Sequence, residues 1–168
     1  MTDLKSSPIV IISMSRWDGD YSSTSWSLAQ TFSKQQIVIY VDYPYTWTEF
    51  LRKRNQPTLE RRKDALLYRK NSLQHLKEYS QNLYALTPPL MLPINWLPNG
   101  RVYDFFSSHR DKILWKSIHK ALAQLGKEEF ILLNAFNPLY LNSPPKDSKL
   151  KAFVYQSQDN IRALEQYL

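Results

Sequence analysis

The sequence predicts an α/β fold: a Rossmann-like, open and mostly parallel sheet of about five or more strands, with helices on both faces. Short runs of apolar and β-branched residues recur along the chain without polar alternation, a pattern typical of strands buried on both faces. Amphipathic segments separate several of these runs, and parallel strands require such crossover connections. The length of 168 residues fits one domain, which is predicted to span residues 1–168.

The first part of the chain is predicted to form a β-α-β unit. Residues 8–14 (PIVIISM) and 37–42 (IVIYVD) are apolar runs of strand length. Between them, Ser22, Ser23 or Thr24 is expected to cap a helix that ends near residues 34 and 35. A right-handed crossover through this helix makes the two strands parallel.

A second helical region follows. The stretch TWTE at residues 46–49 is a capping box and predicts a helix over residues 47–53, with Tyr45 and Phe50 placed to pack across its first turn. Residues 52–77 carry nine lysines and arginines interleaved with leucines, and we expect a basic helical excursion there.

The middle of the chain is predicted to form a short strand followed by a packed loop. Residues 83–87 are the strand, and two prolines end it. Residues 90–100 hold further prolines among apolar side chains, so we expect an extended segment. This segment is predicted to be packed, because Leu92, Trp96 and Leu97 need burial.

The remaining elements continue the alternation. Residues 103–125 have helical periodicity, and Gly126 is placed to terminate that helix. Residues 130–136 and 151–156 are predicted strands, and residues 160–168 read as the opening of a further helix. The predicted apolar stripe of the long helix consists of Leu114, Ile118, Leu122 and Leu125.

Composition excludes several function classes. The absence of cysteine rules out disulfides, thiolate catalysis and cysteine-ligated zinc, and three scattered histidines predict no metal site. The glycine fingerprints of dinucleotide binding and of phosphate-loop hydrolysis do not occur, which argues against both. The longest apolar run, residues 9–12, is too short to cross a membrane and no signal-peptide pattern occurs, so we expect a cytoplasmic protein. The net charge of +7 favours an anionic partner.

The loop over residues 15–22 is the first candidate for a ligand site. In doubly wound folds, ligands bind outside the carboxyl ends of the strands, where this loop meets the amino terminus of a helix. Gly19 would let the backbone approach a ligand or adopt a positive φ, and the neighbouring serines and threonine supply hydroxyls. An ordinary turn with a helix cap explains the same residues equally well.

Several stretches of the chain, in order, carry a resemblance to a known family: IVIISMSRWDGDYSSTSWSLAQTFSK, IVIYVDYPYTW, RRKDALL, TPPLMLPINWLP and FVYQSQDN. They resemble the amino-terminal half of bacterial glycosyltransferases of the GT-B architecture. The resemblance implies the acceptor-side domain of an enzyme that transfers a sugar from a nucleotide-sugar donor to a glycan or lipid-linked acceptor in cell-surface polysaccharide synthesis. It also implies that the carboxyl-terminal donor domain is absent, that this domain binds no cofactor and that it has little or no activity alone.

The resemblance and the loop together give a set of expected site residues. The family commonly has a pair of carboxylates after its fifth strand, whereas here Asp159 stands without a second one, so it is the candidate general base; a helix-capping role is the alternative. Asp42, at the end of the second strand, is expected to have a structural role in capping the turn into residues 43 and 44; a contact with a ribose is the alternative. The predicted substrate-binding residues are Arg16, Trp17, Asp18, Gly19, Ser22, Ser23, Thr24, Asn134 and Asn137.

The basic excursion predicts a second surface. Its cations suit an anionic membrane, so the protein is expected at the inner face of the membrane as a peripheral component; a solvated helix face is the plain alternative. A stand-alone basic α/β module that binds a lipid surface or nucleic acid remains an alternative function, although no nucleic-acid motif occurs. The predicted surface consists of Arg61, Arg62, Lys63, Arg69 and Lys70.

Overall fold

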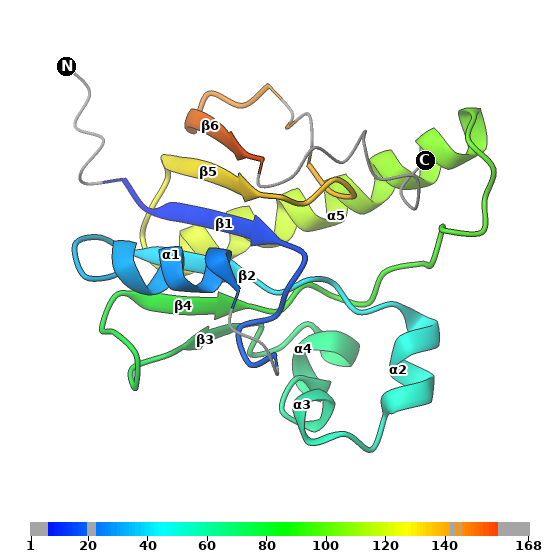
Figure 1. Ribbon diagram of the computed structural model, residues 1–168, viewed down its shortest axis with the longest axis horizontal. Coiled ribbons are helices and arrows are strands. Elements are labelled where there is room, and N and C mark those ends of the chain that lie inside the picture. The colour runs from blue at the N-terminus through cyan, green and yellow to red at the C-terminus, as the bar shows by residue number, and fades with distance from the viewer. Residues whose placement is uncertain (1–6, 20–22, 142–143, 145, 158–168) are drawn as a thin grey trace.

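Six strands form one mixed sheet in the computed structural model, which describes residues 7–19, 23–141, 144 and 146–157 (Figure 1). The strands are β1 (Ile9–Ser13), β2 (Val38–Val41), β3 (Leu73–His75), β4 (Leu83–Leu86), β5 (Phe130–Ala135) and β6 (Leu150–Gln156). The order across the sheet is β3-β4-β2-β1-β5-β6; β3 pairs antiparallel with β4, and every other pair is parallel. The five parallel strands follow the Rossmann order, so the predicted fold class is confirmed.

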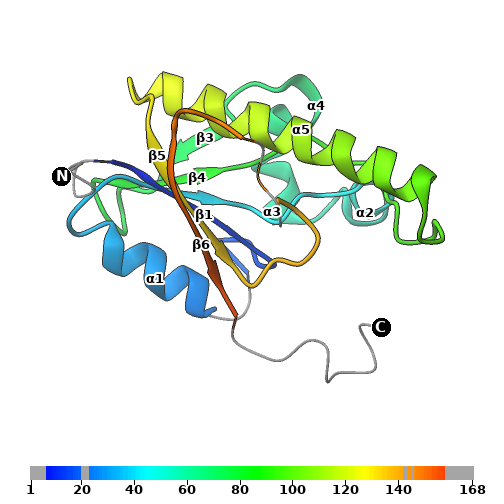
Figure 2. The same cartoon turned by 90° about the horizontal axis from the view of Figure 1, so that it is seen from above.

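Helices lie on both faces of this sheet, as Figure 2 shows from above. The helices are α1 (Thr24–Phe32), α2 (Trp47–Lys53), α3 (Pro57–Glu60), α4 (Lys63–Tyr68) and α5 (Arg101–Gln124). Helix α1 covers one face and α5 crosses the other, while α2, α3 and α4 lie beside the carboxyl ends of the strands (Figures 1 and 2). No helix in the described part of the chain has both the length and the apolarity needed to cross a membrane.

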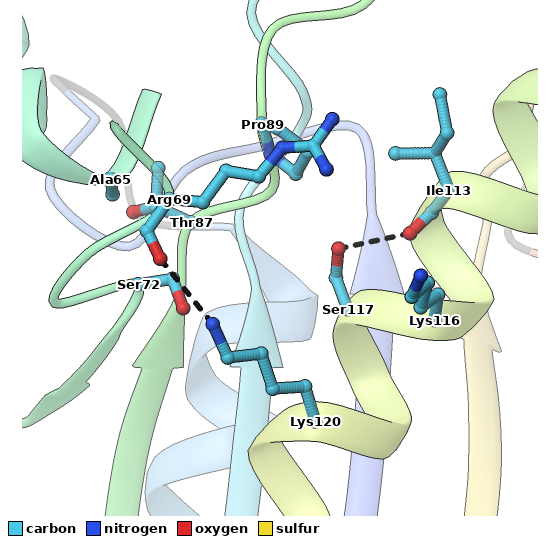
Figure 3. A pocket seen from close by; sticks show the side chains of 9 residues that line it. All are labelled: Ala65, Arg69, Ser72, Thr87, Pro89, Ile113, Lys116, Ser117 and Lys120. Atoms are coloured by element: carbon cyan, nitrogen blue, oxygen red, sulfur yellow. Dashed lines mark hydrogen bonds between the residues drawn. The ribbon is translucent and has the colours of Figure 1, made fainter. Parts of the chain in front are cut away.

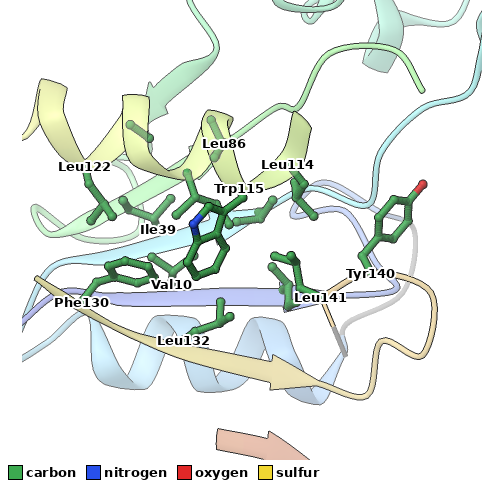
Figure 4. Close-up of a cluster of buried hydrophobic side chains, with 14 of the residues drawn as sticks. Val10, Ile39, Leu86, Leu114, Trp115, Leu122, Phe130, Leu132, Tyr140 and Leu141 are labelled. Atoms are coloured by element: carbon green, nitrogen blue, oxygen red, sulfur yellow. The ribbon is translucent and has the colours of Figure 1, made fainter. Parts of the chain in front are cut away.

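The two central strands bury both of their faces, which explains their unbroken apolar sequences. Val10 and Ile12 of β1 pack toward α5, whereas Ile9 and Ile11 pack toward α1. The same alternation applies to β2, whose Tyr40 faces α1. Figure 4 shows the cluster on the α5 side, where side chains of the sheet meet those of the helix.

Local capping signals position the first two helices as predicted. Ser23 is the N-cap of α1, and its hydroxyl accepts a hydrogen bond from the backbone N–H of Trp26. Thr46 caps α2 in the same way by accepting from the N–H of Glu49. Tyr45 belongs to a small cluster with Leu59, Leu66 and Leu90, and Phe50 packs against it. This cluster holds α2, α3 and α4 together.

The prediction of helix throughout residues 52–77 is wrong in its last part. Pro57 cannot donate a backbone hydrogen bond and occupies the first turn of a new helix, which divides α2 from α3. Arg69 ends α4 with a left-handed backbone at φ 54°, and Asn71 follows at φ 51°. The chain then pairs with β4 as the antiparallel edge strand β3, because Leu73 packs against the α5-side core.

The predicted burial of the 90–100 segment is also wrong in part. Trp96 is 75% exposed and Leu92 is 48% exposed, while Leu97 is half-buried. Met91 and Ile94 take the buried positions instead. The segment therefore anchors through two other side chains and presents its larger apolar groups outward.

The long helix and the later strands agree with their predictions. Leu114, Ile118 and Leu122 are buried against the sheet, and Leu125 packs against the same cluster. Gly126 follows the C-cap with φ 63°, a conformation that glycine adopts at little cost. Strands were expected at 83–87, 130–136 and 151–156, and they are present there with small shifts at their ends. The helix expected over residues 160–168 lies outside the described residues.

Replacing Ile118 of α5 by alanine is expected to lower the free energy of unfolding by about 2–5 kcal/mol, because its side chain is fully buried between the helix and the sheet. Chemical denaturation monitored by circular dichroism measures this change. The control is Val102→Ala on the same helix, where a 59% exposed side chain should change stability by less than about 0.5 kcal/mol. Equal effects of the two substitutions would contradict the packing of α5.

Candidate functional site

The carboxyl ends of β1, β2 and β5 meet the amino terminus of α1 at one edge of the sheet. β1 lies between β2 and β5 and is parallel to both. The chain leaves β1 through α1 toward β2, whereas β5 joins the opposite side of β1 after α5. This is the topological switch point at which open α/β sheets bind their ligands.

Five hydroxyl groups, which we name the hydroxyl cluster, gather at this edge: Ser13, Ser15, Ser23, Ser25 and Tyr40. The Tyr40 hydroxyl lies 2.8 Å from the Ser13 Oγ, 2.6 Å from the Ser15 Oγ and 3.0 Å from the Ser25 Oγ. The Ser23 Oγ lies 2.9 Å from both the Ser15 Oγ and the Ser25 Oγ. The network therefore joins the end of β1 to the first turn of α1.

Strand register explains why the hydroxyl of Tyr40 lies next to the serines of the cluster. Tyr40 is aligned with Ile11 in the parallel pair and points to the α1 face, toward which Ile11 also packs. The ring is buried against Trp26 at 5.3 Å between centroids. Because a buried phenol needs hydrogen-bond partners, the serines at the end of β1 and on α1 supply them.

Two adjoining hollows open at this edge, and both are lined by Met14 and Ser15. The smaller has a volume of about 170 Å³ and the larger about 550 Å³. The larger hollow, which we name the edge cleft, is lined by Met14, Ser15, Arg16, Asp18, Gly19, Tyr45, Lys53, Gln56, Pro57 and Thr58. The smaller hollow, which we name the serine pocket, is lined by Ser13, Met14, Ser15, Ser23, Thr24, Ser25, Ala135 and Phe136.

A buried ion-pair cluster lies behind the edge cleft and consists of Asp18, Arg62 and Asp42. The guanidinium of Arg62 donates to both carboxylate oxygens of Asp18 at 2.7 and 2.8 Å, and its Nε donates to Asp42 at 2.8 Å. Asp42 also accepts from the Thr87 hydroxyl and from the backbone N–H of Trp17. The cluster therefore ties the loop after β1, the ends of β2 and β4 and the segment between α3 and α4.

The protonation of this cluster follows from burial and charge. Burial acts to lower the pKa of Arg62, but hydrogen bonds and charges from Asp18 and Asp42 outweigh it and raise that pKa, so the arginine stays charged. Burial raises the pKa of the Asp42 carboxyl, against the opposing effect of Arg62 and of the Trp17 N–H. Asp42 is structural, as the sequence predicted.

Arg16 forms one wall of the edge cleft. Its two terminal nitrogens donate to the two carboxylate oxygens of Glu49 at 3.1 and 3.0 Å, and its Nε donates to the carbonyl of Tyr43 at 3.0 Å. The guanidinium also lies 3.5 Å from the ring centroid of Tyr45. The Glu49 side chain of the predicted capping box is thus directed to Arg16 and fixes α2 against the first loop.

Of the other residues predicted in the first loop, Trp17 packs against neighbouring aromatic rings, whereas Gly19 lines the edge cleft. Trp17 is half-buried and packs against Trp26 and Tyr79, with ring centroids 6.3 and 6.2 Å away. Gly19 lines the edge cleft without the positive φ that was considered, but an added Cβ would lie 3.3 Å from the Arg16 carbonyl. Ser22 and Asp159 lie outside the described residues.

Asn134 and Asn137 were predicted to bind substrate. Both side chains are buried, however, and their positions are structural. The Asn134 Nδ2 donates to the carbonyl of Asn137 at 3.0 Å, and the Asn137 Nδ2 donates to the carbonyl of Ser13 at 2.9 Å. The Asn137 Oδ1 accepts from the backbone of Leu139 and Tyr140. These amides shape the turn after β5, where Phe136 takes a left-handed backbone at φ 59° beside the serine pocket.

One residue of the predicted anionic surface, Arg62, is not on the surface of the protein. This residue is 4% exposed and fully engaged with carboxylates, so it cannot face a membrane. Arg61, the next residue, is exposed and lies 3.7 Å from Asp18. Lys63 pairs with Glu60, whereas Arg69 and Lys70 are exposed at the end of α4.

Sequence reasoning missed two basic residues on α5. Lys116 and Lys120 line a third pocket together with Arg69, between α4 and α5 (Figure 3). The available signal was the spacing of Lys112, Lys116 and Lys120, which places three lysines along one face of a helix.

No group of three histidine, aspartate or glutamate side chains that could hold a metal ion occurs within the described ranges. His119 pairs with Asp147 at 2.7 Å and contacts the rings of Trp115 and Phe130, while His75 stacks on Tyr84.

A scan against protein-family models finds no match, and searches of curated proteins and of solved structures find none either.

Replacing Arg62 by methionine is expected to lower the free energy of unfolding by about 3–5 kcal/mol, since two buried carboxylates lose their shared partner. The control is Arg61→Met, which removes the same charge from an exposed position and should cost less than about 1 kcal/mol. Urea denaturation of the two variants measures the difference. A loss below 1 kcal/mol at Arg62 would contradict the structural role of the cluster.

Proposed function

We propose that the chain is the acceptor-binding half of a glycosyltransferase, which transfers a sugar from a nucleotide-sugar donor to a glycan or lipid-linked acceptor. The observation that carries this proposal is the pair of hollows at the switch point of the sheet, lined by the hydroxyl cluster and the first loop. The donor would bind a carboxyl-terminal domain facing the same edge. The resemblance of the sequence to this enzyme class supports the assignment.

The chemistry of the two hollows suits a polyhydroxylated ligand. Hydroxyl groups both donate and accept, so the exposed Thr24 of the serine pocket can serve a sugar hydroxyl in either sense. Gln56 adds an amide and Lys53 adds a charged donor to the lining of the edge cleft. Rigid helix and strand ends hold most of these groups, which favours selective binding.

We propose that the described carboxylates at this edge take no part in proton transfer. Asp18 lines the edge cleft, but both of its oxygens accept hydrogen bonds from Arg62. Asp42 is fully buried behind it. A general base for the acceptor hydroxyl is therefore proposed at Asp159 or in the donor domain.

We extend the proposal to a peripheral contact with an anionic membrane at the inner, cytoplasmic face. Six large apolar side chains are exposed at the end of the molecule that holds α2 and the start of α5 (Figure 1): Trp47, Leu51, Leu92, Trp96, Val102 and Phe105. A backbone hydrogen bond from Trp47 to Met91 joins α2 to the 90–100 segment. Arg52, Arg54 and Arg101 are exposed on the same elements. Tryptophan with neighbouring arginine suits an anionic bilayer interface.

The second candidate function, a stand-alone module that binds anionic ligands, is favoured by one observation. Arg69, Lys116 and Lys120 surround one pocket on the α5 face. Nucleic acid is the less favoured ligand of such a module, since the exposed cations alternate with apolar side chains.

Saccharide binding tests the proposed function directly. Monosaccharides and short glycans should give saturation-transfer signals with the protein. Thr24→Trp and Gln56→Trp, at exposed positions of the two hollows, should each weaken binding at least about tenfold by filling space. Ser27→Trp and Asn55→Trp are matched exposed controls outside the hollows.

Absence of saccharide binding by the wild-type chain would remove the acceptor proposal. Binding that survives both blocking substitutions would place the ligand elsewhere on the molecule.

Vesicle sedimentation tests the membrane contact. The protein should bind vesicles that contain phosphatidylglycerol, and the double substitution Trp96→Ser and Phe105→Ser should weaken binding at least about tenfold, since each large apolar side chain contributes about 1.5–3 kcal/mol when buried. Val154→Ser on the edge strand β6 is the control, because it removes an exposed apolar group at another edge. Similar losses in both variants would contradict a contact through the apolar end.

A further inference from the structure

A basic pocket lies on the α5 face of the sheet, apart from the edge cleft and the serine pocket. Its volume is about 180 Å³. Arg69 extends into it from the end of α4 and Lys120 from α5, as Figure 3 shows, and Lys116 also lines it on α5. Ser72, Thr87 and Ser117 add hydroxyl groups, while Pro89 and Ile113 form apolar walls.

The charges of this pocket are unbalanced. None of the nine lining residues is acidic. Arg69, Lys116 and Lys120 take part in none of the ion pairs formed between described residues. Lys116 and Lys120 are like charges one helical turn apart, an arrangement that destabilises a helix. A bound anion would remove this repulsion.

The backbone around Arg69 holds the pocket in place. Arg69 has a left-handed backbone, and its carbonyl accepts a hydrogen bond from the Lys120 Nζ at 3.4 Å. The backbone N–H of Thr87 donates to the carbonyl of Ser72 at 2.8 Å, which closes the floor between β3 and β4. The Lys120 ammonium therefore lies near Arg69 before any ligand arrives.

We propose that this pocket binds a phosphate group, carried either by a small phosphorylated ligand or by a lipid headgroup. A phosphate monoester offers three oxygens and up to two negative charges to one guanidinium and two ammonium groups. A carboxylate offers one charge and two oxygens, and so satisfies fewer of these donors. The apolar walls suit the carbon portion attached to the phosphate. The inference is independent of sugar transfer, so a failed saccharide experiment leaves it standing.

Titration with inorganic phosphate, followed by calorimetry and by the melting temperature, tests the proposal. The wild-type protein should bind phosphate saturably and more tightly than acetate at equal ionic strength, and phosphate should raise its melting temperature. The double variant Lys116→Gln and Lys120→Gln should lose at least about tenfold in affinity. Lys112→Gln, on the same helix face but outside the pocket, should bind as the wild type does.

Folding of the double variant is checked separately. Without phosphate its melting temperature should equal or exceed that of the wild type, because two exposed like charges are removed. Equal binding of acetate and phosphate, or equal losses in the Lys112 and Lys116/Lys120 variants, would overturn the proposal.

Vesicles distinguish the two sources of phosphate. Phosphatidylcholine vesicles containing phosphatidic acid present the monoester on a bilayer. Vesicle binding that is weakened by the double variant and not by Lys112→Gln supports a lipid headgroup. Phosphate binding that is lost in the double variant while vesicle binding is unchanged supports a small soluble ligand. Failure of the wild type to bind phosphate in either form overturns the proposal.

Discussion

The buried ion-pair cluster of Asp18, Arg62 and Asp42 is the interaction on which the geometry of the carboxyl edge depends. One guanidinium, 4% exposed, joins the first loop and the end of β2 to the segment between α3 and α4. Asp42 also accepts hydrogen bonds from the Thr87 hydroxyl and the Trp17 N–H, so its buried carboxyl is bonded to β4 and to the first loop as well as to Arg62. Because desolvated charges cost much when unpaired, the helical segment is held against the sheet in one position. That position sets the walls of the edge cleft.

On the other side of the first loop, the hydroxyl cluster fixes the end of β1 against the start of α1. Tyr40 places its hydroxyl among serines from β1 and α1, so the strand end and the helix start are joined by polar contacts where the apolar core ends. Satisfied buried hydroxyls specify geometry more than they add stability. The proposed acceptor site thus lies between two polar networks, one charged and one neutral. Both are anchored in the central strands, which the core buries on both faces.

Sequence patterns within single segments predicted most of the helices and strands. The features that they did not predict depend on contacts between residues far apart in the chain. Apolar runs and capping residues located β1, β2, α1, α2 and α5, because burial on two faces and N-caps leave marks in adjacent residues. The strand β3 was missed, since its three residues (LQH) gain order only from pairing with β4. Arg61 and Arg62 are adjacent residues of the same type. Arg62 is the buried one, and its two carboxylate partners lie 20 and 44 residues away in the sequence. The first loop was correctly located at the sheet edge, but its division into cleft-lining and packing residues depends on contacts that sequence spacing does not reveal.

Amide hydrogen exchange in the Arg62→Met variant tests the central role of the cluster most directly. The account predicts that residues 15–19 and 57–68 lose far more protection than the amides of β1, β2 and β5, because the first loop and the helical segment are released while the central sheet persists. The Arg61→Met variant should keep the wild-type pattern. A uniform loss of protection across the sheet and these segments would contradict the account, since it would show that Arg62 stabilises the whole fold without specifically positioning the walls of the cleft.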